Sequence, residues 1–188
     1  DLGDLPENFL GINDYAVAPT HAEVVDSGSQ RGLTHAYLAS VSFVDHCVGI
    51  VLDALKSSPH AENTLIVLWS DHGFHLGEKQ HWQKFTTWRA CTRVPLILRV
   101  PKGTTGLPEG TRPGTCTRPA SLLSLAPTLL DLCGLPPVKV HDGPSLVPLL
   151  ANPKAEWPHV ALTHLHHPGS FGLSAERWRY VRYSTGDE

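Results

Sequence analysis

The sequence predicts an α/β protein, the later half of an open sheet sandwiched by helices, followed by the start of a small antiparallel subdomain. Three observations lead to this prediction. A long stretch with helical spacing of apolar residues precedes two short apolar runs, and a second helical stretch follows them. Near residue 155 the pattern changes to the alternation of antiparallel strands. We therefore expect two parts, residues 1–154 and residues 155–188.

The first element is a helix over residues 31–56, where apolar side chains recur at helical spacing and should bury one face. The Ser-Ser-Pro-His run that follows ends it. The apolar residues that define this spacing are Leu33, Tyr37, Val41, Val44, Val48, Val51 and Leu55.

The runs NTLIVLWS (63–70) and VPLILRV (94–100) are short and apolar, which is typical of parallel strands covered on both faces. Residues 120–137 then predict a helix with Pro127 inside it and Gly134 closing it. Residues 143–150 indicate one further helical turn. The alternating runs HVALTHL and RWRYVRY predict antiparallel strands.

Composition narrows the class of protein. The chain has 188 residues, 41% of them hydrophobic and 18% charged, with a net charge of −3, so we expect a soluble globular protein. The lack of a basic excess argues against nucleic-acid partners. The unbroken apolar runs are too short to span a bilayer, so we expect no transmembrane segment. No C-x-x-C pair occurs among Cys47, Cys91, Cys116 and Cys133.

The first apolar run stops at Ser70, Asp71, His72 and Gly73. Ligands gather at the carboxyl ends of strands in open α/β sheets, and a carboxylate beside an imidazole can supply two ligands to a divalent cation. Ser-Asp-His-Gly is also ordinary turn chemistry, so the tetrapeptide alone leaves both interpretations open.

Lysine and histidine follow downstream, at Lys79, His81 and Lys84. An ammonium that reaches a metal site suits an anionic group such as sulfate or phosphate. A solvated loop lysine is the competing interpretation.

The ordered set of these features resembles the type I sulfatases of the alkaline phosphatase superfamily, in the branch of iduronate-2-sulfatase-like and choline-sulfatase-like enzymes. The resemblance covers nearly the whole chain. It is carried by the apolar strand into Asp71-His72-Gly73, then Leu76-Gly77-Glu78, Trp82-x-Lys84 and Arg93-Val94-Pro95-Leu96, and by the two long helical stretches in the same order.

The resemblance implies a role for several residues. Asp71 and His72 match the pair that binds a single catalytic calcium, whose other ligands are expected upstream of this chain. Lys84 matches the lysine that contacts the substrate sulfate and assists the leaving group. His81 is close enough in sequence to Lys84 to line the substrate pocket. Glu78, Trp82 and Arg93 are expected to support the loop, Trp82 by packing and Arg93 through an ion pair, and His75 has no assigned role.

In this family the nucleophile is a formylglycine made from Cys or Ser in a Cys/Ser-x-Pro-x-Arg motif, and no such motif occurs in the chain. We expect it before Asp1, so the chain is expected to be a fragment that is inert alone. The family leads us to expect a periplasmic, extracellular or lysosomal enzyme.

The expected substrate is a sulfated small molecule or glycan, with a glycan sulfate of the iduronate type favoured. Alternatives are a phosphodiesterase or phosphonate monoester hydrolase of the same superfamily, or a non-catalytic or inactive fragment. His164, His166 and His167 suggest either a second metal site or a solvated loop.

Overall fold

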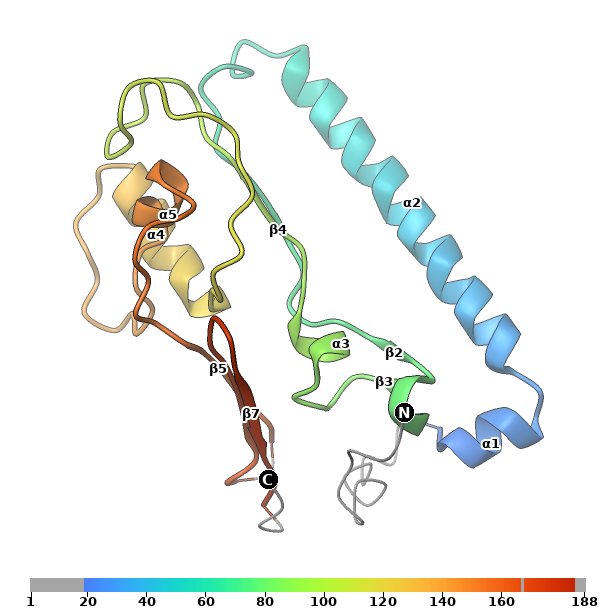
Figure 1. Cartoon of the computed structure of the whole chain (residues 1–188). Coiled ribbons are helices and arrows are strands. Elements are labelled where there is room, and N and C mark those ends of the chain that lie inside the picture. The colour runs from blue at the N-terminus through green and yellow to red at the C-terminus, as the bar shows by residue number, and fades with distance from the viewer. Residues whose placement is uncertain (1–18, 167, 185–188) are drawn as a thin grey trace. The chain divides into compact units, whose positions relative to one another are not determined.

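The computed structural model describes residues 19–166 and 168–184 (Figure 1). The chain forms two compact units, residues 1–99 and residues 100–188, and each is described by itself. The predicted domain boundary after residue 154 stays a prediction.

The described part of the first unit contains a long helix, two pairs of short strands and three shorter helical segments. In chain order its described elements are α1 (His21–Asp26), α2 (Gln30–Lys56), β1 (Ile66–Trp69), β2 (His75–Leu76), the 3₁₀ turn Glu78–Gln80, β3 (Trp82–Gln83), α3 (Arg89–Thr92) and β4 (Leu96–Arg99).

Strands β1 and β4 are the two predicted apolar strands, but they pair antiparallel with each other, with Ile66 opposite Arg99 and Trp69 opposite Leu96. The predicted parallel direction is therefore wrong for this pair. The chain leaves β1, turns back through the β2–β3 hairpin and α3, and returns along β1, whereas a parallel partner needs a crossover. The predicted cover on both faces is also wrong among the described residues, since no residue of β1 or β4 is buried and Trp69 and Ile97 are exposed. An apolar run carries no information about strand direction.

Helix α2 forms over the predicted residues and ends at the capping residue Ser57, yet none of its residues is buried among the described residues. The predicted buried face is thus wrong here. At 1.5 Å per residue the helix is about 40 Å long, and two four-residue strands are too short to cover it. Tyr37 does stack on Phe74, with ring centroids 5.2 Å apart.

Helix α2 is also, by length and composition, apolar enough to cross a membrane, although its unbroken apolar runs are short. Core helices of soluble proteins meet the same criterion. Asp45, His46 and Asp53 lie within its span.

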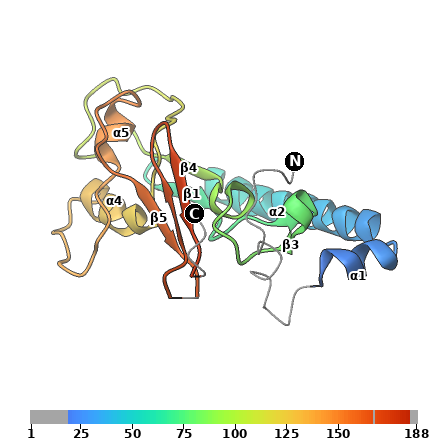
Figure 2. The same cartoon turned by 60° about the horizontal axis from the view of Figure 1, so that its bottom comes forward.

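In the second unit, α4 and α5 lie side by side in both views (Figures 1 and 2). Thr128, fully buried, joins them, because its hydroxyl donates to Ser124 O at 2.6 Å and accepts from Leu146 N at 2.8 Å. The described elements are the 3₁₀ turn Leu122–Ser124, α4 (Leu125–Leu132), α5 (Val147–Ala151), β5 (Ala161–His164), β6 (Phe171–Ser174) and β7 (Arg179–Arg182).

The predicted helix over residues 120–137 is confirmed in its position, with a difference at its start. A 3₁₀ turn precedes α4, so Pro127 falls in the first α-helical turn, where a missing N–H costs nothing, and causes no kink. Gly134, with φ +66°, ends the helix as predicted. Its N–H bonds to Asp131 O and that of Leu135 bonds to Leu130 O, which together form a Schellman cap.

Strands β5, β6 and β7 form a three-stranded antiparallel sheet in that order. The two strands predicted in this region are confirmed, and β6, which was not predicted, lies between them. Gly172, buried in the centre of β6, weakens the strand pattern of that segment.

Gly73 fixes how β1 ends. Its N–H donates to Cys91 O at 2.7 Å, and a Cβ at this position would collide with the Ala90 carbonyl oxygen. The chain after β1 therefore presses directly against α3, and only glycine allows this approach.

Replacing Gly73 should destabilise the first unit through this collision. We expect Gly73→Ala to lower the free energy of unfolding by about 1–3 kcal/mol, measured by urea titration. The matched control is Gly49→Ala within α2, where a Cβ meets nothing within 4 Å. That change should raise stability by about 0.5–1 kcal/mol. Equal effects of the two substitutions would contradict the collision.

Candidate active site

Asp71 and His72 follow the end of β1, as the sequence predicted, and the local backbone orients the imidazole. His72 Nδ1 lies 2.8 Å from Gly73 O, and Ser70 Oγ donates to His72 O at 2.7 Å. A carbonyl oxygen can only accept, so Nδ1 carries the proton and Nε2 keeps its lone pair. This is the tautomer in which histidine binds a metal through Nε2.

Lys84 reaches this lone pair from a different part of the loop. Its Nζ donates to His72 Nε2 at 3.0 Å, and Asp71 Oδ2 lies 3.6 Å from the same nitrogen. The structure thus brings together three of the predicted site residues, a carboxylate, an imidazole and an ammonium. Asp71 is exposed and His72 is partly exposed, so solutes can reach the group.

The pair of Asp71 and His72 fits part of a metal site. One carboxylate and one oriented imidazole lone pair are two ligands, and the Lys84 ammonium is the cation beside them. Calcium takes six to eight ligands. In the part of the chain that the structure describes, no group of three or more His, Cys, Asp or Glu residues could hold a metal. These residues therefore fit a shared site that needs further ligands.

The loop that carries Lys84 has an unusual backbone. Strands β2 and β3 form a hairpin with His75 opposite Gln83 and Leu76 opposite Trp82. Gln83 (φ +68°) and Phe85 (φ +74°), on either side of Lys84, are both left-handed, a region that side chains other than glycine disfavour.

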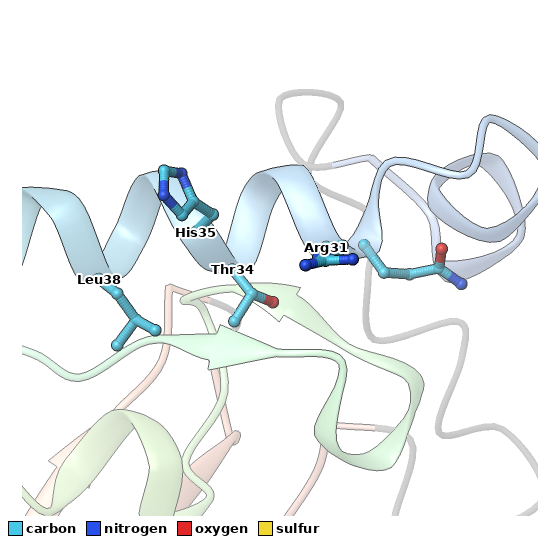
Figure 3. A pocket seen from close by; sticks show the side chains of 5 residues that line it. Arg31, Thr34, His35 and Leu38 are labelled. Carbon is cyan, nitrogen blue, oxygen red and sulfur yellow. The ribbon is translucent and has the colours of Figure 1, made fainter.

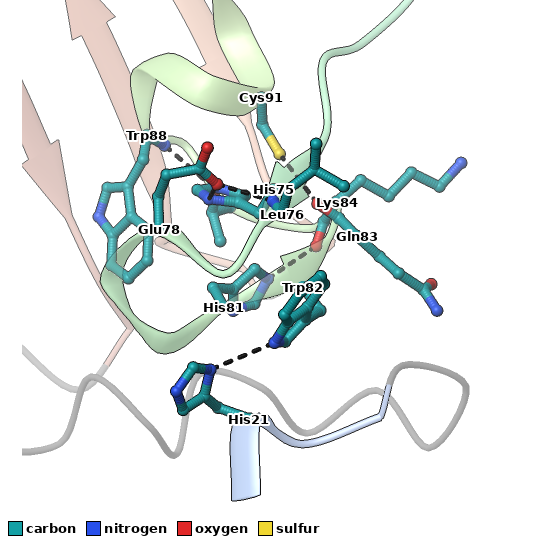
Figure 4. Close-up of polar contacts among 11 residues, drawn as sticks. His21, His75, Leu76, Glu78, His81, Trp82, Gln83, Lys84, Trp88 and Cys91 are labelled. Atoms are coloured by element: carbon teal, nitrogen blue, oxygen red, sulfur yellow. Dashed lines mark hydrogen bonds and ion pairs between the residues drawn. The ribbon is translucent and has the colours of Figure 1, made fainter. Parts of the chain in front are cut away.

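Two buried histidines lie beneath this loop (Figure 4). His75 is 1% exposed and His81 is 4% exposed, with ring centroids 4.9 Å apart, and both rings stand edge-on to Trp88. His81 Nε2 donates to Lys84 O at 2.9 Å, and His75 Nε2 lies 2.8 Å from Thr86 Oγ1.

Burial favours the neutral form of both histidines. Burial, with a smaller contribution from His81, lowers the pKa of His75 to about 4, although Glu78, whose Oε2 lies 3.9 Å from Nδ1, opposes the shift. Burial likewise lowers the pKa of His81. No residue that the structure describes forms a hydrogen bond with His75 Nδ1.

The residues predicted to support the loop divide into two groups. Trp82 is buried as predicted and donates from Nε1 to His21 Nδ1 at 3.2 Å, and Glu78 accepts from Leu76 N at 2.7 Å. Arg93 is exposed, and none of the ion pairs within residues 19–166 and 168–184 involves it. The roles predicted for Lys84, His81, Asp71 and His72 in substrate and metal binding stay predictions.

Sequence analysis missed His75 and Thr86. A histidine within a polar, glycine-containing stretch gives no sign of complete burial, and only its contacts identify it. His164 and His166 are exposed, and His167 lies outside the described residues.

A hollow of about 380 Å³ lies along the start of α2. All of its lining residues come from this one helix (Figure 3). A surface on a single helix does not surround a ligand, so we assign it no function.

Comparison with known protein families and sequences gives a consistent result. The family model for sulfatases matches residues 12–135. A sulfatase of Formosa agariphila is 39% identical over the whole chain, which covers 36% of that protein. Iduronate 2-sulfatase of Mus musculus is 37% identical over 82% of the chain and 32% of its own length. The chain therefore spans about a third of the length of these relatives.

Solved structures give the same fold. One, of a protein in complex with its substrate D-glucosamine-2-N,6-O-disulfate, matches 81% of this chain and 32% of its own, with a TM-score of 0.63 and 30% identity. A phosphonate monoester hydrolase from Silicibacter pomeroyi matches 77% of this chain and 31% of its own, with a TM-score of 0.62 and 28% identity. The predicted α/β fold class is thus confirmed.

The lowered pKa of His75 predicts how stability depends on pH. The folded protein binds this proton less readily than the unfolded chain, so the stabilisation is complete above about pH 6.5 and is lost as the pH falls toward 4. Lowering the pH from 7 to 5 should therefore reduce the free energy of unfolding by about 2 kcal/mol through His75, as measured by urea unfolding. His75→Gln should reduce that dependence, and the part that comes from the buried His81 should remain. The exposed control His60→Gln should leave it unchanged, and a flat dependence in the unsubstituted chain would refute the prediction.

Proposed function

Because the chain belongs to the sulfatase family, we propose that it forms part of a calcium-dependent sulfatase that hydrolyses sulfate esters. The observation that carries this proposal is the 3.0 Å contact of Lys84 Nζ with His72 Nε2 at the end of β1. It puts an ammonium next to two candidate metal ligands, which is the charge arrangement that an anionic ester requires.

In this proposal each residue has one task. Lys84 donates hydrogen bonds to a sulfate oxygen and offsets the negative charge that develops on the leaving oxygen. Asp71 and His72 hold calcium together with ligands outside the described residues. Bound calcium would supply positive charge against the sulfate oxygens as a Lewis acid. The bond to Gly73 O keeps the proton off His72 Nε2. Its lone pair accepts from Lys84 in the structure, and it would bind calcium when the Lys84 ammonium turns to the sulfate.

The nucleophile is proposed to be a formylglycine outside this chain, in the part of the enzyme that corresponds to the remaining length of the relatives. The proposed substrate is a sulfated glycan. Two similarities support it, the relative named iduronate 2-sulfatase and the solved protein bound to a disulfated glucosamine.

Hydrolysis of a phosphonate or phosphate ester is the second candidate, because a phosphonate monoester hydrolase has the same fold over 77% of the chain. Tetrahedral anions of sulfur and phosphorus make similar demands on a metal and an ammonium. Rates on paired aryl sulfate and aryl phosphonate esters decide between the two candidates. Faster hydrolysis of the sulfate ester supports the sulfatase proposal. Faster hydrolysis of the phosphonate ester would contradict it and favour the second candidate.

Lys84→Ala in the full-length enzyme that contains this chain should lower kcat for an aryl sulfate by about 10²–10³-fold, because one preorganised charge is lost. The control Lys102→Ala removes an exposed lysine and should leave kcat unchanged. Full activity of the Lys84 variant would rule out the proposed role.

Asp71→Asn should weaken calcium binding by the same enzyme, because a charged ligand becomes neutral while its size is kept. Isothermal titration calorimetry measures the change, which we expect to be at least about tenfold in Kd. Asp53→Asn on α2 is the control and should bind calcium normally. An unchanged Kd for the Asp71 variant would remove this residue from the metal site.

A further inference from the structure

We propose that His81 and His75 are positioning residues, which hold the backbone on both sides of Phe85 so that the Lys84 ammonium reaches His72. This inference rests on the proposed function, because it explains how the lysine of that site is held. It assigns to His81 a role through the Lys84 peptide, distinct from direct contact with substrate.

Hydrogen bonds between the two buried histidines and the loop hold the loop in place. His81 Nε2 donates to the carbonyl of Lys84 itself at 2.9 Å. His75 Nε2 bonds to the Thr86 hydroxyl at 2.8 Å, and the same hydroxyl accepts from Trp88 N at 3.3 Å. The loop is thus tied at residues 84 and 86, one position on each side of Phe85.

The backbone between and beside these ties needs such a restraint. Gln83 and Phe85 both have positive φ, at +68° and +74°, without being glycine. Such residues persist only where their surroundings hold them, because the extended and right-handed regions are favoured. The two histidine bonds, together with the burial of Trp82 and Thr86, supply that restraint. Without the bonds, relaxation at Phe85 would turn the Lys84 peptide and move its side chain.

The ring nitrogens of the buried histidines distinguish a positioning role from a packing role. His75, His81 and Trp88 pack edge to face, with centroids 4.9 to 5.8 Å apart. A buried apolar ring pair would fill the same space but could not donate to a carbonyl. The donor nitrogen of His81 is therefore the feature that a packing role alone does not need.

A double-mutant cycle in the full-length enzyme tests the proposal. His81→Leu, which fills space without a donor, should lower kcat about 10- to 100-fold with little change in KM, since small misplacements of a catalytic group have effects of this size. His81→Gln keeps a donor near the position of Nε2 and should recover most of the loss. In the Lys84→Ala background, His81→Leu should change kcat less than about twofold, because the residue acts through the lysine.

Thr86→Val provides an independent variant, since it removes the hydroxyl that His75 holds and keeps the side-chain shape. It should likewise lower kcat only when Lys84 is present, whether or not His81→Leu folds. His60→Leu, an exposed histidine of the same unit, is the matched control and should match the unsubstituted enzyme.

The outcomes separate this inference from the proposed function. The positioning role would be overturned if His81→Leu or Thr86→Val lowered kcat by the same factor with and without Lys84. It would also be overturned if His81→Gln recovered none of the lost kcat. If Lys84→Ala itself leaves sulfate-ester hydrolysis intact, the proposed function fails first.

Discussion

The arrangement depends on one hydrogen bond, from His72 Nδ1 to the Gly73 carbonyl oxygen, 2.8 Å away. That bond fixes the tautomer, and the tautomer decides whether Nε2 presents a lone pair or a proton to Asp71 and Lys84. The bond requires a tight turn directly after β1. That turn requires Gly73, because any side chain at this position would collide with α3.

The loop that brings Lys84 to the same nitrogen is built on a different principle. Its backbone adopts left-handed conformations beside the lysine, and buried hydrogen bonds that involve His75 and His81 compensate for their cost. The turn after β1 thus depends on a glycine, whereas the loop that carries Lys84 depends on buried histidines. Each holds one side of the candidate site within the first unit, and the ring of Trp88 packs with the histidines on the loop side, where Trp82 is also buried.

The sequence was sufficient for features that follow from periodicity and residue chemistry. The long helix and the polar end of β1 were predicted in this way. The grouping of Asp71, His72 and Lys84 was implied only by the resemblance to the sulfatases. The antiparallel pairing of β1 with β4 was not predicted, because apolar runs carry no direction. The cluster around His75 was not predicted either, since left-handed Gln83 and Phe85 have no glycine or asparagine to signal them. The start of helix α1 does have a signal in the sequence, the capping box of Thr20 and Glu23.

The most direct test of this account is ¹⁵N NMR of the His72 ring in the chain at mildly alkaline pH. The account predicts a ring protonated at Nδ1, with an unprotonated Nε2 whose resonance moves when Lys84 is replaced by alanine. A ring protonated at Nε2 could neither accept from Lys84 nor bind a cation through that nitrogen, and finding it would contradict the account.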